Sequence, residues 1–130
     1  MKKTFFFLSV LLFIFSCQES LVERAEREAA TYTKKQCPFV LAENIIMDSM
    51  TFDSSTLTFG YHYHLTGALD TMGLADQTRW SQEILKGLKN DPGMKAYMDN
   101  SFKYRYVYRS TKSPEEIIFE TLIAESDYKQ

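Results

Sequence analysis

The sequence predicts an α+β domain in which helices cover one face of a four-stranded antiparallel sheet. Apolar residues recur at helical spacing in two segments, and apolar and polar residues alternate along two others. These elements follow one another as helix, two strands, helix, two strands, without a low-complexity linker. A chain of 130 residues is long enough for one such domain with a single core.

The first helix is predicted to begin near Ser20 and to end before Pro38. Ser20 and Glu23 have the spacing of a capping box, in which each side chain satisfies a free backbone amide. Glu23 also stands four residues before Arg27, the spacing of an ion pair on a helix surface. The apolar stripe of this helix consists of Leu21, Val22, Ala25, Ala29 and Tyr32.

A hairpin is predicted to follow. Residues 45–52 are rich in strand-forming residues, and residues 53–55 have turn chemistry. Residues 57–66 then alternate strictly between apolar or aromatic and polar side chains, which is the clearest strand signal in the chain. The inward-facing set is Leu57, Phe59, Tyr61, Tyr63 and Leu65.

The second half repeats this order. Residues 70–76 are predicted to form a loop, and a second helix follows with its apolar face on Trp80, Ile84, Leu85 and Leu88. Asp91 and Pro92 then fit the cap and first position of a short helical piece. Two strands complete the pattern, at residues 102–109 and 117–123. In the first of them Phe102, Tyr104, Tyr106 and Tyr108 alternate with Lys103, Arg105, Val107 and Arg109.

The N-terminal segment has the layout of a secretory signal. Lys2 and Lys3 precede an apolar run at residues 5–15, whose roughly 11 residues fall short of the about 20 needed to span a bilayer. The run ends in Ile14-Phe15-Ser16-Cys17, which resembles a lipobox. The resemblance implies that residues 1–16 are a signal peptide, that Cys17 carries lipid, that residues 17–19 form a tether, and that residues 20–130 form the domain. A soluble periplasmic protein with a stray cysteine is the alternative.

The resemblance to lipoproteins also implies an address. Gln18 follows the cysteine where an Asp would retain a lipoprotein at the inner membrane, so the outer membrane of a Gram-negative bacterium is expected. Loss of Lys2 and Lys3 would change the net charge from −2 to −4. An acidic domain is a poor nucleic-acid binder, so the expected partners are the membrane, an envelope protein or a second copy of the chain.

Several short motifs resemble those of an uncharacterised family of small exported bacterial proteins. The resemblance covers most of the chain after the signal and implies the fold, without implying an activity. The motifs are Gln36-Cys37-Pro38, Asp48-Ser49, Tyr61-His62-Tyr63, Asp91-Pro92 and Tyr104-Arg105-Tyr106.

His62 and His64 are the first candidates for chemistry, because residues two apart on a strand point to the same side and could share a zinc ion. A third ligand would have to come from Asp48, Asp70 or Glu120. Solvent-facing strand histidines are the alternative. Cys37 has no cysteine left to pair with if Cys17 is lipidated, and it is expected to be buried and inert rather than a nucleophile.

The tyrosine rows are expected to form the core beneath the helices, with any ligand pocket at an end of that layer. On the opposite side of the sheet, Lys103, Arg105 and Arg109 would form a basic strip near the histidines. Such a strip could bind an acidic partner or could be a solvated face.

Two tripeptides resemble the acceptor of an O-glycosylation system found in one large phylum of Gram-negative bacteria. They begin at Asp48 and Asp70, and they make Ser49 and Thr71 candidate modification sites, with Thr71 expected to be the more accessible.

Common enzyme motifs are missing from the sequence, which has no Gly-x-Ser-x-Gly elbow, phosphate loop or His-Glu-x-x-His helix. The leading hypothesis is therefore a non-enzymatic binding or interaction module held at a membrane, with no cofactor. The alternatives are an enzyme that uses His62, His64 or Cys37, and a small-ligand carrier with a tyrosine-lined pocket.

Overall fold

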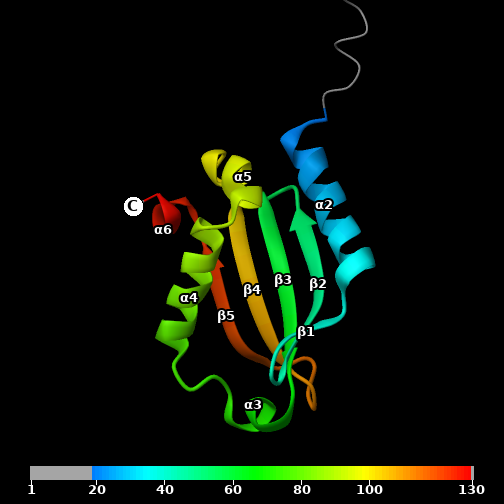
Figure 1. Cartoon of the computed structure of the whole chain (residues 1–130), viewed down its shortest axis with the longest axis vertical. Coiled ribbons are helices and arrows are strands. Elements are labelled where there is room, and N and C mark those ends of the chain that lie inside the picture. The colour runs from blue at the N-terminus through cyan, green and yellow to red at the C-terminus, as the bar shows by residue number, and fades with distance from the viewer. Residues whose placement is uncertain (1–18, 130) are drawn as a thin grey trace, which may run out of the picture.

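Five strands form one mixed sheet in the order β1-β2-β3-β4-β5 in the computed structural model, which describes residues 19–129 (Figure 1). Neighbouring strands pair antiparallel except β3 and β4, which run parallel. The expectation of four strands, all antiparallel, is therefore wrong in number and in direction. The strands are β1 (Phe39–Ala42), β2 (Ile45–Asp53), β3 (Thr58–Leu65), β4 (Lys103–Ser110) and β5 (Ile117–Ile123).

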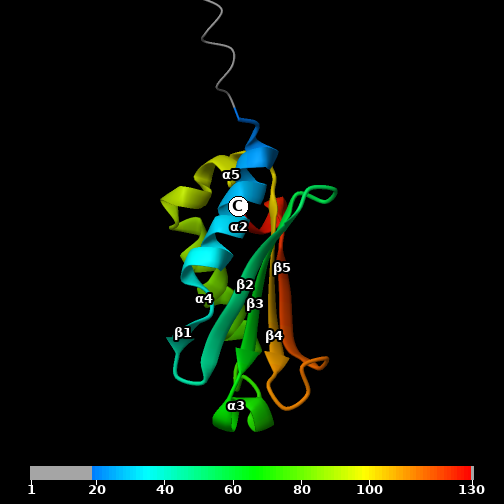
Figure 2. The same cartoon turned by 90° about the vertical axis from the view of Figure 1, so that its right-hand side faces the viewer.

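Helices α2, α4 and α5 lie on one face of this sheet and leave the other face bare, whereas α3 lies at the lower end of the strands (Figure 2). This arrangement was predicted, as was the α+β class. The loop predicted at residues 70–76 overlaps the last residues of a short helix, α3, so that part of the prediction is wrong. The helices are α2 (Leu21–Gln36), α3 (Gly67–Met72), α4 (Gln77–Lys89), the 3-10 turn η2 (Pro92–Met94), α5 (Lys95–Asp99) and α6 (Glu125–Tyr128).

The parallel pairing of β3 and β4 depends on the long segment between them. Parallel neighbours cannot be joined by a tight turn and need a crossover of a dozen or more residues. Here the crossover contains α3, α4, η2 and α5. It therefore places α4 and α5 on the face that α2 already covers.

The start of α2 is held by its own side chains. Ser20 Oγ accepts the backbone N–H of Glu23 at 3.1 Å, as the predicted cap requires. The predicted pair between Glu23 and Arg27 does not form. Arg27 instead donates to both carboxylate oxygens of Glu19, at 2.8 and 2.9 Å.

Thr33 of α2 forms hydrogen bonds with the backbone of β2 where that strand has no outer neighbour. The upper half of β2 has no neighbouring strand on its outer side, because β1 pairs only with residues 45–47. Thr33 Oγ1 donates to the Met50 carbonyl at 2.7 Å and accepts the Met50 N–H at 2.9 Å. One hydroxyl thus satisfies both backbone groups of an edge residue that would otherwise be free to pair with another chain.

The core lies between the sheet and the helices, where inward side chains of the strands meet the apolar stripes of α2 and α4. Phe59, Leu65, Tyr97 and Tyr104 have no exposed surface. No helix within residues 19–129 is long and apolar enough to cross a bilayer.

Replacing Thr33 by valine should destabilise the domain, because both backbone groups of Met50 lose their partner while side-chain volume is kept. We expect a loss of about 1–2 kcal/mol in the free energy of unfolding, measured by urea denaturation. Thr31→Val is the matched control, since Thr31 is exposed on the same helix. Equal losses in the two variants would contradict the role given to Thr33.

Candidate binding groove

Stacked aromatic pairs from β3 and β4 form the floor of the layer beneath the helices. Parallel pairing places Tyr61 opposite Tyr106 and Tyr63 opposite Tyr108. The ring centroids of each pair are 4.5 Å apart, with interplanar angles of 7° and 8°. Because the rings stack along the sheet, their faces cover one another, and their edges and hydroxyl groups point away from the strands.

A groove runs over this floor between α2 and α4. The two helices lie on the same face of the sheet, α2 toward its β2 edge and α4 toward its β5 edge (Figure 1). Its larger part has a cavity volume of about 510 Å³ and is open to solvent. Trp80, Ile84 and Leu88 of α4 form one wall, and Leu41 of β1 lies at the rim. The lining of this part is mostly apolar.

The second part of the groove lies against α2 and has a volume of about 420 Å³. Tyr61 and Asp91 line both parts, so the two adjoin. Tyr32 and Met94 supply apolar surface here. The remaining lining residues are Arg27, Glu28, Thr31, Lys35, Gln36 and Met50.

Among residues 19–129, carboxylates are the only charged groups that line the α4 part of the groove. These are Glu83 and Asp91, and none of the described lysines or arginines lines it. Asp91 Oδ1 accepts the backbone N–H of Gly93 at 2.9 Å as the cap of η2. This part of the groove therefore has a negative potential above an aromatic floor.

The floor tyrosines remain protonated. Burial raises the pKa of Tyr108 to about 12, and burial also raises the pKa values of Tyr61, Tyr63 and Tyr106. The Tyr61 hydroxyl donates to Met94 Sδ at 3.9 Å, and the buried indole N–H of Trp80 has no hydrogen-bond partner within residues 19–129. The groove thus offers neutral hydrogen-bonding groups in an apolar setting.

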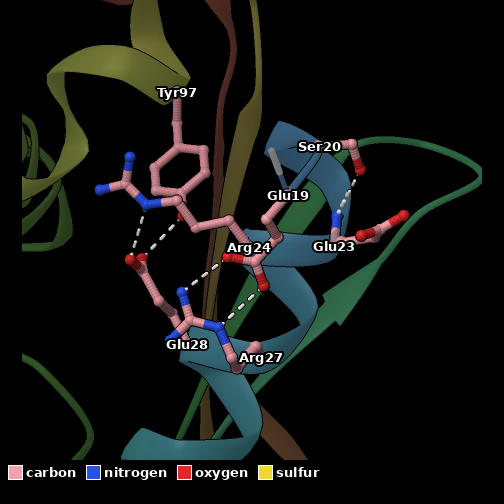
Figure 3. Close-up of polar contacts among 7 residues, drawn as sticks. All are labelled: Glu19, Ser20, Glu23, Arg24, Arg27, Glu28 and Tyr97. Atoms are coloured by element: carbon pink, nitrogen blue, oxygen red, sulfur yellow. Dashed lines mark hydrogen bonds and ion pairs between the residues drawn. The ribbon is translucent and has the colours of Figure 1, made fainter. Parts of the chain in front are cut away.

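A cluster of side chains from α2 and α5 closes the upper end of the groove (Figure 3). The Tyr97 hydroxyl donates to Glu28 Oε2 at 2.7 Å, and Arg24 Nε donates to Glu28 Oε1 at 2.8 Å. The Arg24 guanidinium also lies 5.5 Å from the centre of the Tyr97 ring. Burial alone would raise the pKa of Glu28, but the bonds from Arg24 and Tyr97 outweigh it and lower that pKa.

The histidines lie on the bare face of the sheet, each with its own protein partner. His64 Nδ1 lies 2.6 Å from Asp48 Oδ1, and His62 Nε2 lies 3.0 Å from Thr51 Oγ1. Burial and the nearby Arg109 and Arg105 lower the pKa of His62. Residues 19–129 contain no group of three His, Cys, Asp or Glu side chains placed to hold a metal ion. Of the suggested third ligands, only Asp48 lies beside a histidine.

The three basic residues also lie on the bare face: Arg109 pairs with His64 on β3, Arg105 with Gly60 and Lys103 with Thr58. Arg105 Nε donates to Glu120 Oε1 at 2.5 Å, so this part of the strip is neutralised. Lys103 is exposed and Arg109 is half-buried. Lys103 and Arg105 line an open hollow of about 330 Å³ together with His62, and Arg109 is not part of its lining.

The remaining candidates lie apart from the groove floor. Cys37 is half-buried, and burial together with Asp48 raises the pKa of its thiol, which favours the unreactive protonated form. Thr71 is exposed on α3, whereas Ser49 is half-buried in β2. Cys17 lies outside the described residues.

The sequence analysis did not predict this groove, which lies between the helices rather than at an end of the tyrosine layer. Gly87 was the available signal. It falls on the apolar stripe of α4, where glycine costs about 1 kcal/mol relative to alanine. A Cβ added at Gly87 would meet no atom within 4 Å, because the residue faces the groove.

The chain belongs to a family described as a domain of unknown function (DUF8479), whose model matches residues 20–119. No curated protein matches the sequence with significance.

Three solved structures share the fold. The first is a candidate secreted protein of Pseudomonas aeruginosa, with a TM-score of 0.66 and 10% identity over 85% of this chain and 99% of that chain. A type 2 secretion system pilotin of Vibrio vulnificus has a TM-score of 0.65 and 10% identity over 82% and 90% of the two chains. A type II secretion system pilotin of Vibrio cholerae has a TM-score of 0.60 and 13% identity over 80% and 88%. At these identities the likeness shows the fold alone.

Replacing Tyr97 by phenylalanine should weaken the closed end of the groove, since the fully buried ring stays and only its bond to Glu28 is lost. We expect a loss of about 1.5 kcal/mol in the free energy of unfolding at pH 7. Because the pKa of Glu28 is lowered in the folded state, the stability it contributes is present above its ordinary pKa of 4.5 and lost as the pH falls below that value. The loss should therefore shrink at pH 3.

A double-mutant cycle with Glu28→Gln isolates this bond. In that background Tyr97→Phe should cost less than in the native chain, because the neutral amide is a weaker acceptor than the carboxylate. An equal cost in both backgrounds, measured by urea denaturation at pH 7, would contradict the pairing.

Proposed function

We propose that this member of the DUF8479 family is a lipid-anchored envelope protein that binds an apolar helical segment of a partner protein in the groove between α2 and α4. The observation that supports it most directly is the open groove itself, with its stacked tyrosine floor and its mostly apolar lining. Aromatic residues that keep a polar tip in contact with water are typical of protein interfaces.

The shape of the groove favours a polypeptide over a small ligand. Small-molecule sites bury most of the ligand, whereas both parts of this groove are open along their length. The walls are helices, and a third helix can pack between them through residues at positions i, i+3, i+4 and i+7. A carrier of a small apolar ligand is the second candidate, because about 510 Å³ lies within the usual range for such sites.

The chemistry of the groove favours binding over catalysis. None of the histidines or cysteines that the structure describes lines it, and its tyrosines are held in the neutral form by burial. The similar pilotins are named as parts of type II secretion systems, which supports a protein as the partner. The acidic pair Glu83 and Asp91 favours a segment that also carries a lysine or arginine.

The lipid anchor is the part of the proposal that rests on Cys17. Intact mass spectrometry of the full-length protein from bacterial membranes should give a chain that begins at residue 17 and carries acyl mass. Cys17→Ala should lose the acyl mass and leave the membrane fraction. An unacylated native chain in the soluble fraction would refute the anchor. The same spectra would show whether glycan mass is present. If Thr71 carries the glycan, Thr71→Ala should remove that mass.

Gly87 offers a way to fill the groove without disturbing the fold. Gly87→Leu places a side chain in the groove from a helix position where a Cβ meets nothing, so stability should be kept or should rise by up to about 1 kcal/mol. A photo-crosslinking residue introduced in place of Glu83, on the groove wall, should form polypeptide adducts in intact bacteria. Gly87→Leu should reduce their yield at least tenfold.

Gly87→Ala is the matched control, because it adds the helix-stabilising methyl group without filling the groove, and it should leave the adducts unchanged. The same crosslinker at Gln82, which faces away from the groove on α4, should give none of these adducts. Lipid adducts at Glu83 would favour the carrier instead. Polypeptide adducts that Gly87→Leu does not affect would refute binding in the groove.

A further inference from the structure

Helix α4 carries its acidic and its basic side chains on different faces. Glu83 and Asp91, which follows the last turn, line the groove. Lys86 and Lys89 line a separate hollow on the outer side of the helix. Arg79 is exposed and is not among the described residues that line the groove. The wall that α4 presents to the groove is therefore acidic, although the helix itself is rich in lysine.

The two groove carboxylates also differ from the other charged groups around the groove in having no close counter-charge. On the α2 wall Lys35 stands in the last turn, where the helix dipole favours a cation. Glu83 and Asp91 belong to none of the close pairs of a basic and an acidic side chain within residues 19–129. Those pairs are Arg24 with Glu28, Arg27 with Glu19, His64 with Asp48, Lys95 with Asp99, Arg105 with Glu120, and Lys129 with Glu125.

Gly87 lies midway between these carboxylates, four residues after Glu83 and four residues before Asp91. Residues four apart are neighbours on a helix surface, and this is the spacing at which a glutamate pairs with a lysine. A cation above Gly87 is therefore within reach of both carboxylates. Gly87 has no side chain to supply that cation, and a Cβ placed there meets no atom within 4 Å. The position opens into the groove and is free to receive a group from outside the chain.

The surroundings of Asp91 favour a positive charge at this place. Asp91 Oδ1 accepts the Gly93 N–H at 2.9 Å, which leaves Oδ2 for another donor. Burial is the largest cause of the raised pKa of Tyr106, and the charges of Tyr108 and Asp91 raise it further. The last carbonyl groups of α4 add the negative end of the helix dipole. The negative potential of the acidic wall thus extends to the tyrosine floor.

We propose that the partner segment in the groove carries an arginine or lysine whose side chain lies across Gly87 and whose cation bonds to Glu83 and Asp91. The methylene groups of such a side chain can cover the tyrosine floor while its charged end reaches the carboxylates. A guanidinium has five N–H donors in one plane and can bond to both carboxylates at once. This inference rests on the proposed groove and names the side chain by which the groove selects its partner.

A cation placed in the chain itself tests this site without the partner. Lysine and methionine have similar helix propensity and length, so Gly87→Lys and Gly87→Met differ mainly in charge. At low ionic strength the full-length Gly87→Lys protein should melt about 2–4 °C above Gly87→Met, measured by circular dichroism. The difference should vanish when Glu83→Gln and Asp91→Asn are added, and asparagine keeps the cap of η2. Equal melting temperatures in the presence of both carboxylates would overturn the proposal.

Photo-crosslinking in intact bacteria tests the side chain of the partner. A crosslinking residue in place of Thr31, which lines the α2 part of the groove, should form polypeptide adducts. The double variant Glu83→Gln, Asp91→Asn should lower their yield at least tenfold, because the partner's cation loses both acceptors. Gly87→Lys should have the same effect, since its ammonium occupies them. Glu26→Gln is the matched control, because Glu26 is exposed on α2 outside the groove lining, and it should leave the yield unchanged.

The outcomes separate this inference from the groove itself. If Gly87→Leu removes the adducts at Thr31 and the double variant does not, the groove stands and the basic side chain is refuted. If neither Thr31 nor Glu83 yields polypeptide adducts, the groove is refuted together with this inference. Sequencing of the adducts should find an arginine or lysine within about two helical turns of the crosslinked position. A partner segment without one there would also overturn the proposal.

Discussion

The parallel, in-register pairing of β3 with β4 is the constraint on which the other features of this domain depend. It stacks tyrosine on tyrosine at two successive positions, and at a third it stacks Phe59 on Tyr104, with centroids 5.7 Å apart. It also requires a crossover connection, and that connection brings α4 and α5 to the face where α2 packs. Floor and walls of the groove are thus consequences of one strand pairing.

The hydroxyl groups explain why the helices stand apart over this floor. A tyrosine completely covered by a helix leaves its hydroxyl without water, and an unpaired buried hydroxyl is costly. Tyr104, under the closed end, carries such an unpaired hydroxyl, whereas its stacking partner there is a phenylalanine. Over Tyr61 and Tyr106 the gap between α2 and α4 keeps the hydroxyls at the edge of an open groove. An empty groove is therefore compatible with a stable fold.

Periodicity predicted most elements of the fold but could not predict how they pair. Alternation along β3 and β4 is the same for a parallel and an antiparallel neighbour, since it reports only which face is buried. The strand β1 has four residues and no alternation, so its sequence carries no strand signal. Helix α3 begins with Gly67 at a φ of 55°, a residue that usually marks a turn. The spacing of apolar residues correctly predicted the type of each element that has a long amphipathic pattern.

The candidate site was harder to predict than the fold because it depends on a distance between helices. The apolar stripe of α4 contains the groove wall and the core contacts in one row, and only Gly87 departs from the usual pattern of that row. The cluster that closes the upper end was also hidden, since Glu28 and Tyr97 are 69 positions apart in the sequence. Contacts of that kind follow from topology, which the pattern of single elements does not specify.

Comparing the two faces of the sheet indicates which of them is suited to binding. On the bare face Arg105 is paired with Glu120 and His64 with Asp48, and the apolar Val107 has no exposed surface. A partner there would have to break these two pairs to reach Val107. On the helix face the apolar surface is open, and within residues 19–129 no lysine or arginine joins Glu83 and Asp91 in lining the α4 part of the groove. Binding energy is therefore available on the helix face, which is why the histidines and arginines that stand out in the sequence are poorer candidates than the tyrosines.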